Sequence, residues 1–364
     1  MPSLLALDFP LGPTLVEELV ECAMTSQAFC VLDQRLSPRK RQEILELLGA
    51  THVRSAEGTV AIPSGTPVEE GDGLVMLTSG SSGTPKAAIH TWASLVASAD
   101  ITQRSLRGEQ APVWLPLLPP AHIGGLAVLL RHVLNDADFR WTSDIEDGPR
   151  MGATHVAVVR AQLARHDLSG YEKVLVGGGK PPTSRADNVI ATWGMTETGS
   201  GVVYDGYPLD EVAIRVIDSQ ICVHSPTLFR AYRSSERPRI DLDGQEWFPT
   251  GDGGELVDGR LRVFGRLGSV IVTGGEKVWP EDLEALFAQV DHVRDVAVVG
   301  IDDNEWGQRV VALVVSDTPV DDELLERAAE RIGPWAKPKE IRYVAAIPRT
   351  ANGKIARAGL EHLY

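Results

Sequence analysis

Short apolar runs alternate with amphipathic stretches along the chain up to about Trp193. Residues 74–77 form an apolar run with turn residues on both sides, which predicts a buried strand. Ser37, Pro38 and Gly49 occupy the N-cap, first-turn and stop positions of a helix. We expect further strands and helices, the strands at 112–115, 138–142, 154–159, 173–176 and 189–193, and the helices at 92–106 and from the segment 121–126 to Leu134. This alternation predicts a layered α/β domain with a substantially parallel sheet.

The pattern changes twice in the second half of the chain. Residues 212–263 read as short strands separated by turns, which predicts a β-rich subdomain. After Gly265 we expect a compact α+β unit with a helix starting near Pro280, strands at 294–301 and 309–315, and a helix within 319–331 whose apolar face includes Val320 and Leu324. The predicted fold is therefore an α/β N-terminal domain, residues 1–265, followed by a small, mobile α+β C-terminal domain, residues 266–364.

Composition and charge narrow the classes of partner. The chain has 364 residues, 43% of them hydrophobic and 23% charged, which is ordinary for a soluble protein of more than one domain. A net charge of −15 argues against nucleic acid and anionic membranes. The cysteines show no metal-ligand spacing, the N-terminus lacks the basic region of a secretory signal, and no uncharged apolar run approaches membrane-spanning length. We expect a cytoplasmic protein.

A Gly/Ser/Thr loop follows the predicted strand 74–77. Its polar and glycine residues are Thr78, Ser79, Gly80, Ser81, Ser82, Gly83, Thr84 and Lys86. Glycines let backbone amides approach an oxyanion, hydroxyls donate further hydrogen bonds, and an ammonium neutralises charge, so the loop is suited to phosphate. The alternative is an ordinary flexible turn. Gly80 and Gly83 are too close together for a Walker loop, and Ala87 follows the lysine, which disfavours a P-loop kinase or GTPase.

Two more glycine-rich loops follow predicted strands. Gly177, Gly178 and Gly179 come directly after strand 173–176, and the loop 194–201 carries one carboxylate and several hydroxyls. Ligands of open α/β sheets bind beyond the carboxyl ends of strands, so the loop at Gly177 is placed to lie near the first loop.

Taken together, the motifs resemble the signature series of the adenylate-forming enzymes, which include acyl-CoA ligases, peptide-synthetase adenylation domains and luciferases. The resemblance covers residues 74–357 and rests on segments in a fixed order: 78–86, 193–197, 250–252, 265–266, 274–277 and 352–354. It implies that a carboxylate attacks the α-phosphate of ATP to give an acyl-adenylate and pyrophosphate, after which a thiol, here of coenzyme A, displaces AMP.

The resemblance also implies roles for individual residues. Loop 78–86 would hold the β- and γ-phosphates, Thr196 phosphate, and Glu197 the Mg²⁺; Lys354 would bridge the attacking carboxylate and the α-phosphate. Trp193 stands where the family commonly has a tyrosine against adenine, and Asp252 and Arg266 would bind the ribose. The residues that would contact the nucleotide are Gly177, Gly178, Gly179, Trp193, Gly194, Met195, Asp252 and Arg266. These roles suit in-line attack at phosphorus, which needs positioning and charge neutralisation.

Each of these residues has an alternative structural interpretation. Lys354 could be an exposed surface lysine and Glu197 a solvated loop carboxylate. Asp252 could form a turn in its glycine-rich segment, and Trp193 could be part of the core. The motif context favours function for Lys354, Glu197 and Asp252, and leaves Trp193 open.

The family alternates its small domain between two poses. The hinge usually carries an aspartate two residues after the arginine, where this chain has Gly268. Glycine tolerates a backbone change but lacks the side chain. In the second pose, Gly274 and Gly275 would line the path of the pantetheine thiol.

The short stretch before the phosphate loop and the segment 203–209 resemble a subgroup, the compact actinobacterial o-succinylbenzoate–CoA ligases of menaquinone biosynthesis. This resemblance implies an aromatic keto-diacid substrate, whose second carboxylate needs a donor or cation. The candidates are His122, Arg131, Ser200 and Gly201. A structural role is equally open for His122, and Arg131, on a helix face, is expected to be exposed to solvent.

Three rival functions stay open at this point. A ligase for another aryl or short- to medium-chain acid would share the ATP-binding residues. A carrier-loading adenylation enzyme would load a carrier-protein thiol and not free coenzyme A, and we see no attached carrier domain with its Asp-Ser motif, which weakens this alternative. A catalytically inactive nucleotide-binding protein would be expected to lack Lys354 or Glu197, which are both present. Family members are often homodimers, but no segment of this sequence indicates an interface.

Overall fold

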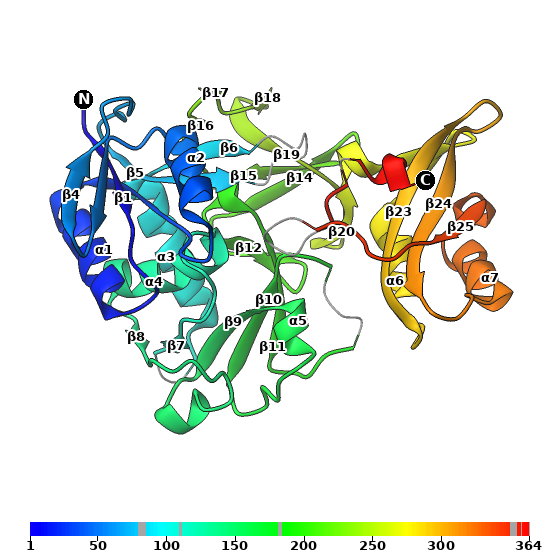
Figure 1. Cartoon of the computed structure of the whole chain (residues 1–364), viewed down its shortest axis with the longest axis horizontal. Helices are drawn as coiled ribbons and strands as arrows, with labels where there is room; N and C mark the ends of the chain where they lie inside the picture. The colour runs from blue at the N-terminus through cyan, green and yellow to red at the C-terminus, as the bar shows by residue number, and fades with distance from the viewer. Residues whose placement is uncertain (79–84, 109–110, 181–183, 350–354, 358, 364) are drawn as a thin grey trace.

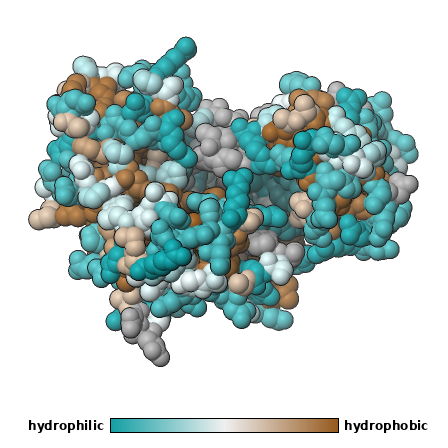
Figure 2. All heavy atoms as spheres, turned by 60° about the horizontal axis from the view of Figure 1, so that its bottom comes forward, coloured by the Kyte–Doolittle hydropathy of each residue, from teal (hydrophilic) through white to brown (hydrophobic). Residues whose placement is uncertain are grey.

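The computed structural model describes residues 1–78, 85–108, 111–180, 184–349, 355–357 and 359–363. A large N-terminal domain of several packed sheets is joined to a small C-terminal domain (Figure 1). Hydrophilic residues cover most of the face shown in Figure 2, and apolar residues appear there in scattered patches. Within the described ranges, no helix combines the length and apolar character needed to cross a membrane.

The first sheet of the large domain carries the predicted strand before the phosphate loop. Its strand order is β17 (Ser235–Glu236), β16 (Ala231–Tyr232), β6 (Lys86–Thr91), β5 (Asp72–Thr78), β2 (Ala28–Val31), β1 (Leu4–Leu7), β3 (His52–Ser55) and β4 (Gly58–Ala61). The pairs between β5, β2, β1 and β3 are parallel. The remaining pairs, which include β5 with β6 and β6 with β16, are antiparallel. The β16 hairpin, far away in sequence, therefore lies beside β6, the strand that begins at Lys86.

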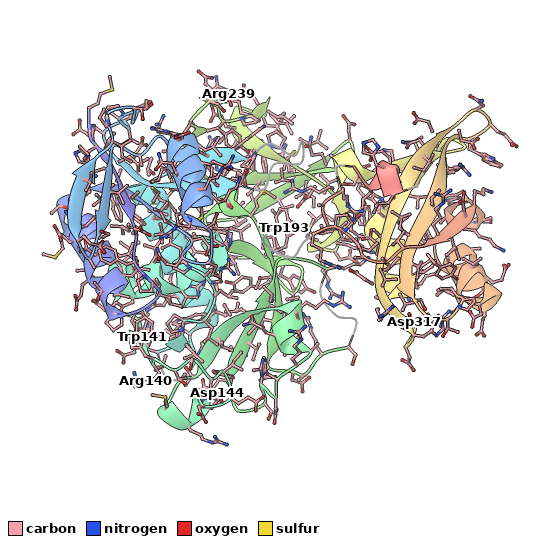
Figure 3. All side chains as sticks on the ribbon, in the orientation of Figure 1. Arg140, Trp141, Asp144, Trp193, Arg239 and Asp317 are labelled. Carbon is pink, nitrogen blue, oxygen red and sulfur yellow. The ribbon has the colours of Figure 1, made fainter. Side chains whose placement is uncertain are left out.

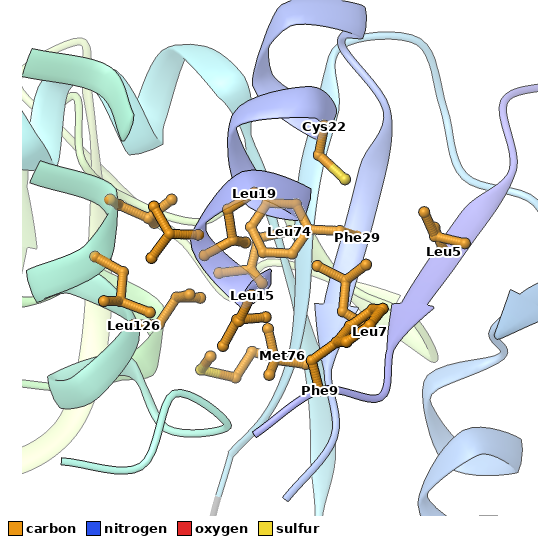
Figure 4. Packing of buried hydrophobic residues seen from close by; sticks show 14 of the residues in the cluster. Leu5, Leu7, Phe9, Leu15, Leu19, Cys22, Phe29, Leu74, Met76 and Leu126 are labelled. Atoms are coloured by element: carbon orange, nitrogen blue, oxygen red, sulfur yellow. The ribbon is translucent and has the colours of Figure 1, made fainter. Parts of the chain in front are cut away.

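Helices cover both faces of this sheet. On one face, α1 (Pro13–Thr25), α3 (Trp92–Leu106) and α4 (Ile123–Asn135) enclose a core that includes Leu15, Leu19, Phe29 and Leu126 (Figure 4). On the other face, α2 (Pro38–Leu48) packs Leu45 and Leu48 against the strands. As predicted, Ser37 caps α2 by accepting from the Lys40 amide, and Gly49 ends it with a left-handed φ of 68°.

The second sheet is parallel through most of its width. Its strand order is β13 (Tyr207–Pro208), β12 (Gly201–Tyr204), β11 (Val189–Gly194), β10 (Lys173–Gly177), β9 (His155–Val159), β7 (Val113–Leu115) and β8 (Asp138–Phe139), with α5 (Arg160–Leu163) following β9. Strands β11 to β8 are parallel, and β12 and β13 add an antiparallel edge. Strand β8 is shorter than the predicted 138–142, because pairing with β7 involves only Asp138 and Phe139.

The third sheet forms the predicted β-rich subdomain. It contains β14 (Ala213–Ile217), β15 (Gln220–His224), β18 (Ile240–Leu242), β19 (Gln245–Val257) and β20 (Arg260–Arg266), all antiparallel. The expectation of short strands is wrong for β19, which has 13 residues. Glycines 251, 253 and 254 did not interrupt it because the strand bulges opposite both neighbours.

The small domain packs helices against a mainly antiparallel sheet. The sheet contains β22 (Glu276–Val278), β21 (Ile271–Thr273), β24 (Gly307–Ser316), β23 (Val293–Asp303) and β25 (Glu340–Tyr343); the helices are α6 (Pro280–Phe287) and α7 (Asp322–Arg331). The last helix begins later than predicted, because Asp321 caps it by accepting from the Leu324 amide. Val320 therefore precedes the helix and is not part of its apolar face.

The two domains meet around the segment η3 (Leu267–Ser269), which follows β20. Gly253 of β19 lies against the ring of Trp279, and Lys180 forms an ion pair with Asp282 in the first turn of α6. Nothing lies within 4 Å of the position that a Cβ on Gly268 would take. The domain boundary at 265/266 and the hinge at Gly268 stay predictions.

Candidate active site

A short turn, η2 (Thr196–Thr198), joins β11 to β12 and packs against β5 and β6 of the other sheet. The His90 Nε2 atom lies 2.7 Å from the Thr196 carbonyl oxygen, and the Phe229 amide donates to the Glu197 carbonyl at 2.9 Å. Both partners belong to, or directly flank, strands of the first sheet. The backbone of the predicted Thr-Glu motif is thus fixed from across the sheet boundary.

His90 makes its contact as a neutral imidazole. It is fully buried, and this burial lowers its pKa to about 4, although the hydrogen bond to the Thr196 carbonyl opposes the shift. A carbonyl oxygen only accepts, so Nε2 carries the proton and donates, while Nδ1 lies 3.2 Å from the Ser94 hydroxyl. His90 thereby ties the end of β6 to the loop that carries Glu197.

The Glu197 carboxylate is held by a tyrosine from the β16 hairpin. The Tyr232 hydroxyl donates to Glu197 Oε1 at 2.9 Å, and Glu197 is buried. Burial, reinforced by the charge of Glu197, raises the pKa of Tyr232, so the phenol stays protonated and donates. The Lys86 ammonium lies 5.1 Å from the centre of the same ring, within cation–π range. Tyr232 therefore contacts both the lysine that ends the predicted phosphate loop and the predicted metal-binding carboxylate.

A second group of predicted residues meets where β11 approaches β19 and β20. Arg266 Nε lies 3.0 Å from Asp252 Oδ1, and the indole N–H of Trp193 donates to Asp252 Oδ2 at 2.9 Å. Asp252 and Arg266 face each other in the β19–β20 register, and Arg266 also donates to the Thr250 carbonyl at 3.0 Å. Figure 3 places Trp193 at the centre of the molecule.

The predicted glycine positions lie close to these groups. Gly177 ends β10 beside β11, and a Cβ at this position would come within 2.8 Å of the Thr192 hydroxyl. A Cβ at Gly194 would come within 2.1 Å of the Ser200 carbonyl oxygen, at the bulge where β11 turns away from β12. A side chain at either position would displace the turn that carries Glu197 or the strand beside it.

Arg131 corrects the expectation of solvent exposure. Arg131 is only 5% exposed, and its guanidinium carbon lies 4.3 Å from the centre of the Trp114 ring. Helix α4 packs against both α1 and α3 and is buried on most sides, so this helix face is not a surface. Burial lowers the pKa of Arg131, and its Nε and Nη1 atoms have no hydrogen-bond partner among the described residues.

Arg131 lines one small cavity between α3, α4 and the η2 loop, and Ser200 contacts its wall through Ser98. The Ser98 hydroxyl, which lines the cavity, lies 2.9 Å from the Ser200 hydroxyl. The cavity is lined by Leu95, Ser98, Ala99, Ala127, Leu130, Arg131 and Gly199. Its walls are therefore apolar except for one guanidinium and one hydroxyl, and its volume of about 10 Å³ is room for about one water molecule.

The other predicted acyl-pocket and CoA-path residues lie elsewhere. His122 is the residue before α4. Its Nε2 atom lies 3.3 Å from Nη2 of the Arg35 guanidinium and 3.8 Å from the Asp33 carboxylate. Gly274 and Gly275 form the turn between β21 and β22, both with positive φ. Residues 79–84 and Lys354, predicted for phosphate binding and catalysis, lie outside the described residues.

Three contacting residues were missed by the sequence analysis: His90, Ser98 and Tyr232. A histidine inside the apolar strand 86–91 is a detectable signal for a buried polar role. Ser98 and Tyr232 gave no signal, because each meets its partner across 102 and 35 residues of chain, respectively.

Two family profiles match the chain. The family described as AMP-binding enzyme matches residues 17–260, and that described as AMP-binding enzyme C-terminal domain matches residues 282–354. The chain is 36% identical, over 338 residues, to a probable 2-succinylbenzoate–CoA ligase of Mycobacterium tuberculosis, covering 84% of this chain and 88% of the other. It is 30% identical to the 2-succinylbenzoate–CoA ligase of Bacillus licheniformis, covering 78% and 68% of the two chains.

Solved structures share the fold at lower identity. The o-succinylbenzoate CoA synthetase of Bacillus subtilis, in complex with its acyl-adenylate intermediate, superimposes with a TM-score of 0.84 at 23% identity, covering 99% of this chain and 88% of that one. ATP-bound MatB of Rhodopseudomonas palustris superimposes with a TM-score of 0.82 at 16% identity, covering 100% and 89%. The arrangement of domains is thus common to these proteins.

The neutral state of His90 predicts a pH-dependent contribution to stability. Its pKa falls from 6.5 to about 4 on folding, so the unfolded chain binds the extra proton between these values and stability declines as the pH falls through this window. At pH 5 wild type loses about 2 kcal/mol through this group relative to pH 7. His90→Gln keeps an N–H donor but does not titrate. Its stability deficit at pH 7 is therefore expected to shrink by about that amount at pH 5.

Urea unfolding of both proteins at the two pH values, at fixed ionic strength, measures this difference. His166→Gln, which replaces an exposed histidine, is the matched control. A deficit of His90→Gln that is the same at both pH values would contradict a neutral His90.

Proposed function

Because this chain belongs to the family of AMP-binding enzymes, we propose that it is an o-succinylbenzoate–CoA ligase. It activates one carboxylate of this keto-diacid with ATP, releases pyrophosphate, and transfers the acyl group to the thiol of coenzyme A with release of AMP. The observation that carries the choice of acid is the 36% identity to a probable 2-succinylbenzoate–CoA ligase. The buried guanidinium of Arg131, whose Nε and Nη1 have no hydrogen-bond partner among the described residues, supports this choice.

A buried arginine without an anionic partner is costly, because the contact of its guanidinium with the Trp114 ring offsets only part of the hydration that the charge has lost. A dicarboxylate substrate removes this cost: one carboxylate reacts while the other pairs with Arg131, and guanidinium groups bind carboxylates in a forked geometry. A monocarboxylic acid of the same length would leave Arg131 unpaired, so the pocket selects for two carboxylates.

The nucleotide contacts follow from the paired groups already described. Lys86 and the loop before it hold the phosphates, Asp252 accepts from the ribose hydroxyls, and Arg266 fixes Asp252. The carboxylate of Glu197 suits Mg²⁺, a hard cation that takes oxygen ligands from one or two carboxylates together with substrate phosphates. When bound, Mg²⁺ neutralises charge on the phosphate oxygens. Tyr232 fixes one oxygen of the Glu197 carboxylate.

The reaction then needs two nucleophilic steps. An oxygen of the substrate carboxylate attacks the α-phosphorus, and pyrophosphate leaves; Lys354 neutralises the charge that builds up between these groups. The thiolate of coenzyme A next attacks the acyl carbon, and AMP leaves. Gly274 and Gly275 line the thiol path in the second pose of the small domain. Homodimer assembly and a cytoplasmic location stay predictions from the sequence.

Product analysis tests this function directly. We expect incubation with ATP, Mg²⁺, coenzyme A and o-succinylbenzoate to give AMP and o-succinylbenzoyl-CoA by mass spectrometry. The panel also contains benzoate, a cinnamate, medium-chain fatty acids and amino acids. A different thioester with AMP would keep the mechanism and reject the acid. ADP, or no turnover with any acid, would reject the family's chemistry for this chain.

Arg131→Met tests the second-carboxylate contact. Truncating one partner of a buried ion pair lowers kcat/KM for o-succinylbenzoate on the order of a hundredfold. An analogue of o-succinylbenzoate that keeps the reacting carboxylate and lacks the other is expected to be little affected by the substitution. The free variant should be no less stable than wild type, since the substitution removes an uncompensated buried charge.

Steady-state kinetics with o-succinylbenzoate and this analogue, together with thermal unfolding, measures both effects. Arg150→Met, at an exposed arginine, is the control. An equal loss with both acids would show that Arg131 does not recognise the second carboxylate.

A further inference from the structure

The indole of Trp193 joins two sheets through one hydrogen bond. Trp193 lies on β11, pairs with Val203 of β12, and packs its half-buried ring against the core under β14 and β15. Its N–H donates to Asp252 Oδ2 on β19, 59 residues further along the chain. The resemblance to the family explains why an aromatic ring stands at Trp193, since the ring would lie against adenine. An aromatic ring without an N–H would serve that purpose equally well.

Asp252 is fixed at both of its oxygens. Arg266 Nε contacts Oδ1 at 3.0 Å from the neighbouring strand β20, and Trp193 Nε1 contacts Oδ2 at 2.9 Å from the second sheet. The Asp252 amide also donates to the Thr250 hydroxyl, which in turn donates to the Ile221 carbonyl. The backbone and Oδ1 of Asp252 are thus held within the third sheet, whereas Trp193 holds Oδ2 from the second sheet.

Geometry explains why the donor matters. A carboxylate can rotate about its Cβ–Cγ bond, and a single partner on one oxygen leaves this rotation open. A rigid indole has one N–H and no acceptor, so it fixes the position of the second oxygen without competing for incoming hydroxyl protons. A vicinal diol needs both carboxylate oxygens in one plane, facing the sugar, and hydrogen bonds to charged groups are strongly directional.

We propose that Trp193 is a positioning residue for ribose recognition: its N–H orients Asp252 toward the 2′- and 3′-hydroxyls of the nucleotide, in addition to any contact of its ring with the base. This inference rests on the proposed function, because it requires that the site binds an adenine nucleotide. The preference of the site for ribose over deoxyribose therefore depends on the contact that Trp193 makes between the second and third sheets.

Trp193→Phe separates the two roles, because phenylalanine keeps an aromatic face and removes the donor. Isothermal titration calorimetry with AMP and 2′,3′-dideoxyAMP gives the ratio of their Kd values, which reports recognition of the diol alone. We expect the substitution to reduce this preference for AMP by about tenfold, the value of one hydrogen bond to a charged group. Both ligands are measured on one preparation, so a partly folded sample does not change the ratio.

Asp252→Ala must lower the same preference, measured as the Kd of 2′,3′-dideoxyAMP divided by the Kd of AMP. Adding Trp193→Phe to Asp252→Ala must not lower this preference further. Trp141→Phe, far from the site, is the control (Figure 3). If AMP and 2′,3′-dideoxyAMP weaken equally in Trp193→Phe, Trp193 acts on the base alone and the inference is overturned, while the proposed function stands. If wild type binds neither nucleotide, both fail.

Discussion

The site depends on one short turn being held by two sheets at once. The turn η2 belongs to the chain between β11 and β12, yet its carbonyls accept from His90 and Phe229 and its carboxylate accepts from Tyr232, all in the region of β6 and β16. The tertiary contacts are needed because three residues of 3₁₀ helix have little stability of their own. Without them, Glu197 would have no fixed position relative to β5 and β6.

Buried polar groups account for most of this precision. A neutral histidine, a protonated tyrosine and a paired carboxylate fill positions where apolar residues would pack equally well, and each is satisfied by a partner from another element. Such networks specify one arrangement, because any alternative leaves a polar group unpaired in a low dielectric. Arg131 is the exception, because two of its nitrogens lack a hydrogen-bond partner among the described residues.

A few cationic side chains close to the site would explain how an acidic protein binds a polyanion such as ATP. The net charge of −15 repels ATP at long range, so attraction must come from a few close groups. Lys86, held over Tyr232, and Arg266, paired with Asp252, are fixed by contacts with the fold. Fixed donors lose little entropy on binding and act at short range, where salt and the overall charge of the protein matter least.

Much of the fold could be predicted from the sequence, because its local signals are strong. The cap at Ser37, the stop at Gly49 and the apolar run before the phosphate loop each have a local physical cause, and the order of motifs indicated the family. The length of β19 could not be predicted, since bulges let its glycines remain in the strand. The burial of Arg131 depends on two helices that enclose α4, and the contact of Tyr232 with Glu197 depends on how β16 joins the sheet. Local pattern does not encode either packing.

The central claim is that a carboxylate oxygen of the substrate attacks the α-phosphorus. Turnover of o-succinylbenzoate labelled with ¹⁸O on both oxygens of the reacting carboxylate, followed by mass spectrometry of all products, tests it most directly. One oxygen becomes the bridge of the acyl-adenylate and leaves with AMP, while the other stays in the thioester carbonyl. The account therefore predicts a single ¹⁸O atom in AMP and unlabelled pyrophosphate. Label in released phosphate or pyrophosphate, with AMP unlabelled, would contradict it.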